Sequence, residues 1–442
     1  MSEQKRTDRG KRPSAQRSRR SAGVDQFKVY GDDEDVKSAG SRRGEKTPKR
    51  KKKKKSALSG ITSWVKERSQ RARAFFKDVP AGKEQASILR SFRFWLLVAA
   101  AIIVTLSGMV FLENKNLSVD AVSVTIVGLD SNLEGYRILL LSDLNGRRFG
   151  DKQSTLLRQI GTMSYDIVVM TGDMVGPGGD PEPLYELLEG LPNRKKVYFI
   201  CGDSDPGPYR KKATAEKGKL SELVLDDWIL GAIDRGAIYI DRPTRIATSS
   251  TAFWVSPASL LNLNLSEAVP TLKEQMEQEQ AGYVSGIQAD HDSLPFTSYR
   301  YEIATRAFEA LTQMTDSELH IALSHVPPSS AFIQATFEHG SDKSNFLGQP
   351  DLILGGHYCG GVWRIPFYGA FYKPNSAAPR YGWFPSQESV AGLSTVGETQ
   401  MYISRGLSTC SDAPLLRFHL FNRPQISLLT LTATLPSSML ED

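Results

Sequence analysis

Aspartate and histidine residues recur along this chain, each shortly after a short apolar run. The runs are RILLL at 137–141, IVVM at 167–170, VYFI at 197–200, IAL at 321–323 and LIL at 352–354. They lead into Asp143, Asp173, Asp203, His325 and His357. Carboxylates and imidazoles are common ligands of divalent metal ions. The series therefore predicts a metal site.

The apolar runs have the length and composition of buried β-strands, and helical stretches alternate with them. This alternation predicts an α/β fold with a parallel or mixed sheet and helices on both faces. The carboxyl ends of the strands in such a sheet share one crevice, where ligands bind. A single aspartate after a strand is most often a turn former or a helix cap, but a series of five favours a shared site.

At these residues the chain resembles the calcineurin-like metallophosphoesterase superfamily, and in particular its bacterial membrane-anchored branch. The family motifs are D-x-H, G-D, G-N-H-D, a lone His and G-H-x-H. The matching stretches, in the same order, are Asp143–Asn145, Gly172–Asp173, Gly202–Asp205, His325 and Gly356–Cys359. The resemblance covers roughly residues 135–430. It implies a four-layer α/β/β/α sandwich.

The resemblance also implies two divalent metal ions (Mn, Zn or Fe) that clamp the phosphate of a substrate. Carried over by position, one ion would be held by Asp143, Asn145, Asp173 and Cys359. The other would be held by Asp173, Asp203, His325 and His357. The third motif supplies the catalytic candidates Ser204 and Asp205.

Three histidines of the family pattern are replaced in this chain. Asn145 offers a weak carbonyl ligand, and Cys359 offers a thiolate that favours Zn or Fe. The first metal position is therefore expected to be weak or empty. Ser204 can donate a hydrogen bond but cannot serve as an acid near neutral pH. These changes leave two alternatives open: a working enzyme with unusual metal chemistry, or a degenerate site that binds without turnover.

The basic charge of the chain is concentrated near its N-terminus. Residues 1–93 hold 28 of the 55 Lys and Arg but 11 of the 49 Asp and Glu, so the remainder is acidic. Residues 49–55 are consecutive Lys and Arg. Such a segment cannot bury enough apolar surface to fold, so we expect residues 1–92 to be a mostly disordered tail. The three cysteines include no CxxC pair, which argues against a disulfide scaffold or a zinc finger.

Residues 94–112 form a run of 19 uncharged, mainly apolar residues. As a helix this run would cover roughly 28 Å, close to the thickness of the hydrocarbon layer. It lies too far into the chain for a cleaved signal peptide. We therefore expect a transmembrane helix at 93–113, a linker at 114–134, the metallophosphoesterase-like domain at 135–432 and a C-terminal tail at 433–442. The positive-inside rule places the N-terminus in the cytoplasm and the domain outside.

Together these features predict a single-pass membrane protein with an extracytoplasmic phosphoesterase domain. Its substrate would be a phosphomonoester or phosphodiester, such as a lipid-linked or envelope component. The alternative is a catalytically degenerate binding or signalling protein with the same fold. The tail would bind anionic lipids at the inner leaflet. Because the membrane run follows the tail closely, we do not expect nucleic acid to be its partner.

Overall fold

The computed structural model describes residues 83–192, 196–212, 222–284, 293–315, 317–340, 345–373, 382–409 and 417–434. The described residues from 110 onward belong to one compact unit, and residues 83–109 belong to a second. The predictions for residues 1–82 and 435–442 lie outside the described residues.

Helix α2 (Lys83–Lys115) contains the apolar run. Within Ser91–Lys115 the mean hydropathy of an 18-residue window is 2.5, and length and composition allow this stretch to cross a membrane. The helix starts ten residues before the expected span at 93, since residues 83–92 contain no glycine or proline that would end it.

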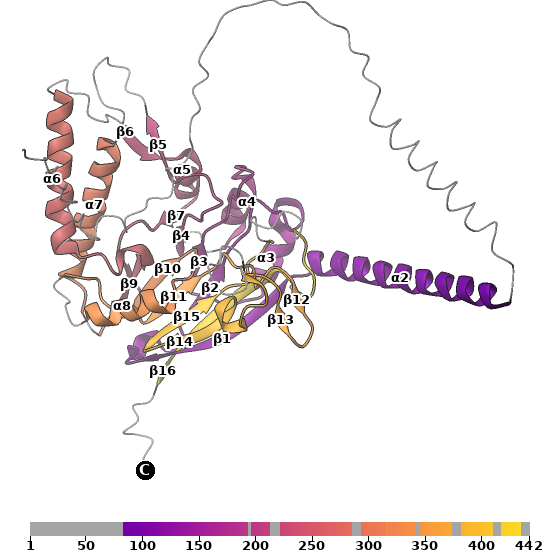
Figure 1. The fold of residues 1–442 in the computed structure, drawn as a ribbon. Coiled ribbons are helices and arrows are strands. Elements are labelled where there is room, and N and C mark those ends of the chain that lie inside the picture. The colour runs from indigo at the N-terminus through magenta and orange to yellow at the C-terminus, as the bar shows by residue number, and fades with distance from the viewer. Residues whose placement is uncertain are drawn as a thin grey trace, which may run out of the picture. The chain divides into compact units, whose positions relative to one another are not determined.

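The compact unit contains two six-stranded sheets (Figure 1). The first has the order β1-β16-β2-β3-β4-β7. Its strands are β1 (Ser118–Val127), β16 (Gln425–Thr434), β2 (Arg137–Leu141), β3 (Ile167–Thr171), β4 (Val197–Ile200) and β7 (Ala237–Tyr239). Strands β2, β3, β4 and β7 are parallel, and β16 is antiparallel to β2. Parallel neighbours end at the same edge, so residues that follow β3 and β4 come close together.

The second sheet has the order β14-β15-β11-β10-β9-β8. Its strands are β14 (Gly392–Val396), β15 (Thr399–Ile403), β11 (Leu352–Gly355), β10 (His320–Ser324), β9 (Ala252–Pro257) and β8 (Thr244–Ala247). The four central strands are parallel, and both edge strands are antiparallel to their neighbours. Strands β2, β3, β4, β10 and β11 match the five predicted runs to within one residue at each end.

The central strands of each sheet are buried on both faces, which explains why strands such as β2, β3 and β11 are mainly apolar. In β2, Ile138 and Leu140 pack in a core that also contains residues of the second sheet, whereas Leu139 and Leu141 pack in a core with residues of α3, α4 and α5. Successive strand residues point to opposite faces, so one strand serves both cores. A third core joins the outer face of the second sheet to α7 and α8.

Among the described residues, six α-helices accompany the sheets, and Figure 1 shows α6 and α7 beside each other, well away from α3 and α4. They are α3 (Ser154–Ile160), α4 (Glu182–Gly190), α5 (Asp227–Asp234), α6 (Leu265–Val284), α7 (Leu294–Leu311) and α8 (Ser330–Gly340). Two small antiparallel pairs complete the strands: β5 (Tyr209–Lys212) with β6 (Glu222–Leu225), and β12 (Arg364–Ile365) with β13 (Gly369–Ala370).

The expected linker at 114–134 is structured. Residues 118–127 form β1, which pairs in parallel with β16 over ten residues. The segment is rich in Val, Ser and Thr, and Val124 and Ile126 are buried while their neighbours are exposed. This alternation suits an edge strand with one buried face. The domain therefore begins near residue 118, and its last strand reaches Thr434 rather than ending at 432.

Candidate metal centre

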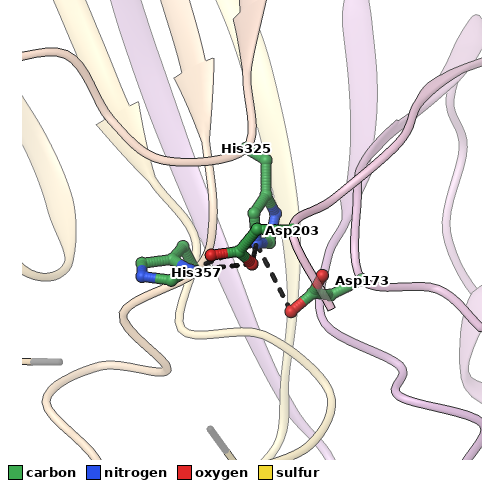
Figure 2. Close-up of side chains that lie close together, drawn as sticks. All are labelled: Asp173, Asp203, His325 and His357. Atoms are coloured by element: carbon green, nitrogen blue, oxygen red, sulfur yellow. Dashed lines mark hydrogen bonds and ion pairs between the residues drawn. The ribbon is translucent and has the colours of Figure 1, made fainter. Parts of the chain in front are cut away.

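Four side chains from four strand ends come together in the domain (Figure 2). One ligand atom of each lies within 4.8 Å of the others. Asp173 follows β3, Asp203 follows β4, His325 follows β10 and His357 follows β11. We call this group the four-residue cluster. It joins the carboxyl edge of the first sheet to that of the second, as expected for ligands of an α/β fold.

The imidazole of His325 lies at the centre of the cluster. Its Nε2 is 3.0 Å from Asp203 Oδ1, 3.4 Å from Asp173 Oδ2 and 3.2 Å from His357 Nδ1. Its Nδ1 is 2.8 Å from the backbone carbonyl oxygen of Thr171. A carbonyl can only accept, so Nδ1 carries a proton and Nε2 faces the carboxylates. A metal-binding histidine is commonly oriented by such a hydrogen bond from its other nitrogen.

Negative charge is concentrated in and around the cluster. Burial alone would raise the pKa of Asp203, but hydrogen bonds from His325 and His357 hold that pKa well below its usual range. Burial would lower the pKa of His325, but Asp173, Asp203 and Asp143 raise it well above its usual value. Burial raises the pKa of Asp143 to about 6. These carboxylates favour a positive charge among them.

Several buried polar atoms beside the cluster have no hydrogen-bond partner among the described residues. They include Nε2 of His357 and both side-chain atoms of Asn145. Figure 2 shows the His357 ring with one nitrogen toward Asp203 and the other directed away from the cluster. Unpaired buried polar groups are costly, so such atoms indicate that a ligand belongs there. The two carboxylates and two imidazoles of the four-residue cluster fit a divalent cation such as Zn, Fe or Mn.

The loops that carry the candidate ligands have unusual backbones. Five non-glycine residues in them have positive φ angles: Asp143 (54°), Asn145 (49°), Asp173 (52°), His357 (71°) and Cys359 (46°). Each such residue costs about 1–3 kcal/mol and persists only where the surrounding structure enforces it. Their concentration at the strand ends supports a functional role for these loops.

Two glycines allow the loops to approach closely. A Cβ at position 202 would lie 2.2 Å from the backbone nitrogen and Oδ1 of Asp173. A Cβ at position 356 would lie 1.8 Å from Ser142 Oγ and 2.9 Å from Asp143 Oδ2. Neither distance can be accommodated, so these positions require glycine if the aspartates are to keep their places.

Ser204 and Asp205 both contribute to the geometry of the loops. The backbone N–H of Ser204 donates to Asp173 Oδ1 at 2.8 Å. The buried carboxylate of Asp205 accepts from three backbone N–H groups, those of Val175 and Gly176 at 2.8 Å and that of Gly202 at 2.9 Å. Asp205 thereby ties the loop after β4 to the loop after β3. Catalytic roles for these two residues stay predictions.

The remaining candidates for the first metal position lie next to the cluster but outside the group of four. Asp143 accepts from the His357 backbone N–H at 3.1 Å and from Ser142 Oγ at 2.5 Å. The backbone N–H of Asn145 donates to the Asp173 carbonyl at 2.7 Å. The Cys359 thiol is buried, donates to the His357 carbonyl at 3.6 Å and packs in a small apolar group. The two predicted positions thus differ in how completely their ligands are assembled.

Sequence reasoning missed the residues that orient the ligands. Thr171 and Ser142 are the last residues before two of the motif loops, and they contact His325 and Asp143 respectively. Thr171 contacts His325 through its backbone carbonyl, which any residue could supply, and His325 lies on a distant segment, so a single sequence does not reveal that pairing. For Ser142 the available signal was a hydroxyl group directly before a candidate ligand.

Two arginines that follow Asn145 bind other parts of the domain. Arg147 donates to the carbonyl of Asn114, in the last turn of α2, and lies 2.8 Å from His419 Nε2. Arg148 is half-exposed and pairs with Glu186 at 3.0 Å. The loop after β2 is therefore fastened to the C-terminal end of α2 through Arg147.

Comparison with known proteins gives a distant likeness. The chain matches no family model and no curated protein. The crystal structure of phosphopantetheinyl hydrolase (PptH) from Mycobacterium tuberculosis is similar over 61% of this chain and 89% of its own chain, with 12% sequence identity and a TM-score of 0.30. A TM-score this low does not bear on the function of the chain.

Proposed function

We propose that this protein is a metal-dependent phosphoesterase. The four-residue cluster is the observation that carries the proposal, because it assembles two carboxylates and two imidazoles at adjoining strand ends. The fold would be a four-layer α/β/β/α sandwich of the calcineurin-like type. The buried cores on both faces of each sheet, with helices in the outer two, support that arrangement.

The residues of the site would have different roles. Asp173, Asp203, His325 and His357 would hold a divalent ion, which would act as a Lewis acid on phosphoryl oxygens. Thr171 holds the His325 ring in its orientation, and the Ser204 amide holds the Asp173 carboxylate. Asp143 and Asn145 would serve a second, weaker position beside the first.

The proposal includes a place at a membrane. Helix α2 would anchor the chain, with the domain on the extracytoplasmic side and the basic tail against anionic lipids inside. Such an anchor suits a phosphate ester at the bilayer surface, for example a lipid-linked one. The hydropathy of residues 91–115 supports the anchor.

A second candidate is a binding or signalling protein with a degenerate phosphoesterase site. The surroundings of Cys359 favour it, because its thiol packs with Val362 rather than joining the cluster. A chain with a single assembled metal position could bind phosphate groups without turnover.

Hydrolysis of bis-p-nitrophenyl phosphate by the full-length chain would separate the two candidates. Stripped protein would be reloaded with Mn, Zn, Fe or Co in turn. The proposed enzyme releases p-nitrophenol with at least one metal, and the Asp173→Asn variant releases none above background. Absence of product with every metal, while the wild-type chain still binds metal, would favour the binding protein.

A further inference from the structure

A pocket of about 380 Å³ lies beside the four-residue cluster and shares His325 with it. Residues at strand ends of both sheets line it, including Cys201, Tyr239 and Ser259. Tyr209 of β5 and Tyr299 of α7 line it as well. A cavity of this size is large enough for a small organic group.

The pocket continues the crevice that contains the cluster. The cluster uses the ends of β3 and β4 in the first sheet and of β10 and β11 in the second. The pocket uses the ends of β4 and β7 and of β9 and β10. In each sheet the pocket therefore lies one strand farther along the same carboxyl edge, because β7 follows β4 and β9 follows β10 in the strand order.

The pocket walls are mainly apolar. Ile200, Leu260, Ile303 and Leu323 are buried hydrophobic residues among the lining. None of the described residues that line the pocket is a lysine or an arginine, and Asp241 is their one carboxylate. A second phosphate or another anion would find no lysine or arginine among these lining residues, whereas an apolar group would gain from burial.

One part of the lining is polar. The hydroxyl oxygens of Tyr209 and Tyr299 lie 3.1 Å and 3.2 Å from Asp241 Oδ2, and the two hydroxyl groups also hydrogen-bond each other. Arg242 holds the same carboxylate, with its Nε 2.8 Å from Oδ1. Burial raises the pKa of both tyrosines well above the usual value, so they stay neutral phenols. A neutral phenol oxygen can still accept a hydrogen bond from a hydroxyl or an amide of a ligand.

We infer that this pocket binds the alcohol part of the phosphate ester, and that this part is uncharged and mainly apolar. The inference rests on the proposed function, since it places the phosphate at the cluster and the ester group one strand farther along. It excludes nucleotides and other substrates whose second anionic group would occupy the pocket.

Three phosphonates that cannot be hydrolysed test the inference by binding alone: methylphosphonate, benzylphosphonate and 4-carboxybenzylphosphonate. They would be titrated into the full-length chain in lipid nanodiscs with saturating Mn²⁺. Benzylphosphonate should bind about tenfold more tightly than methylphosphonate, because its ring enters the apolar pocket. The carboxylate of 4-carboxybenzylphosphonate should cancel that gain, since it would lie near the carboxylate of Asp241, with no lysine or arginine among the lining residues. Equal affinities for all three would overturn the inference.

A variant that fills the pocket, compared with a matched control, tests whether the preference for benzylphosphonate arises in this pocket. Ser259 is an exposed serine in the pocket lining, so Ser259→Trp can occupy the space without replacing a buried side chain. Ser249 is an exposed serine before the start of β9, at the opposite end of that strand. Ser259→Trp should remove the preference for benzylphosphonate and leave methylphosphonate binding unchanged, and Ser249→Trp should change neither. The same loss in both variants, or in neither, would contradict the assignment.

The failure of this inference and that of the proposed function give different results. If no ester is hydrolysed with any metal but the benzyl preference persists and depends on position 259, the enzyme proposal fails and the pocket assignment stands. If bis-p-nitrophenyl phosphate is hydrolysed but the phosphonates bind equally, the enzyme proposal stands and the pocket assignment fails.

Discussion

Replacement of Gly202 by alanine should disable the candidate metal centre through one added methyl group. That methyl carbon would lie 2.2 Å from the backbone nitrogen and Oδ1 of Asp173. Carbon atoms in ordinary contact stay about 3.5–4.0 Å from their neighbours, so Asp173 or the loop of Gly202 must move by more than about 1 Å. Asp173 is a member of the cluster, whose ligand atoms lie within 4.8 Å of one another.

Overpacking of this kind costs about 1–3 kcal/mol of folding free energy. A ligand whose support is disturbed loses about 10–100-fold in metal affinity. Calorimetric titration of the full-length chain with Zn²⁺ or Mn²⁺ would measure that loss, and thermal unfolding would measure the cost in stability. Gly178→Ala is the matched control, since Gly178 has no atom within 4 Å of an added Cβ. Wild-type affinity in the Gly202→Ala variant would refute the assignment of Asp173 as a ligand held by this loop.

Three further predictions concern the first metal position, the buried His320 and the contact of Arg147 with α2. Asn145→His together with Cys359→His should tighten a second, weaker metal site in titrations, and adding Ser204→His should raise phosphodiester hydrolysis; unchanged stoichiometry would argue against the first metal position. Burial lowers the pKa of His320 to about 4. Because the unfolded chain binds that proton near pH 6.5, the contribution of His320 to the free energy of unfolding should fall by roughly 3 kcal/mol from pH 6.5 to 4. Chemical unfolding of the wild type and of His320→Gln at both pH values would measure this contribution as the difference between the two proteins, and equal pH dependence would contradict it. Arg147→Ala should lower the unfolding temperature by several degrees more than Arg148→Ala does. The reason is that Arg147 contacts Asn114 and His419, whereas Arg148 forms an ion pair at the surface. Equal shifts in the unfolding temperature would show that the contact with α2 adds no stability.

The strands that deliver the ligands could be predicted because they are apolar throughout. A run such as Ile167–Met170 is buried on both faces, so its composition alone separates it from loops. The aspartates and histidines at the strand ends could also be predicted, because each follows an apolar run within a few residues. The edge rule for parallel strands predicts that Asp173 lies near Asp203 and that His325 lies near His357, because each pair follows neighbouring strands of one sheet. It does not predict that the two pairs meet, since they belong to different sheets.

Other features depend on contacts that one sequence does not reveal. Strand β1 pairs with β16, about 300 residues later, and its short polar and β-branched residues suit a linker as well as an edge strand. The sequence does not reveal that the carboxylate of Asp205 accepts hydrogen bonds from three backbone N–H groups. The pocket phenols, Tyr209, Tyr239 and Tyr299, come from three separate segments, so only the folded chain identifies them as neighbours.

The metal content of the full-length chain tests the central claim most directly. Purified protein would be stripped with a chelator, reloaded and measured by elemental mass spectrometry, beside the variants Asp173→Asn and Asp180→Asn. Asp180 is a half-exposed aspartate that pairs weakly with Arg148, so its variant is the control. We predict about one tightly held ion per wild-type chain, the same in Asp180→Asn and none in Asp173→Asn. Equal metal content in all three proteins, or none in the wild type, would contradict the assignment of the four-residue cluster as a metal centre.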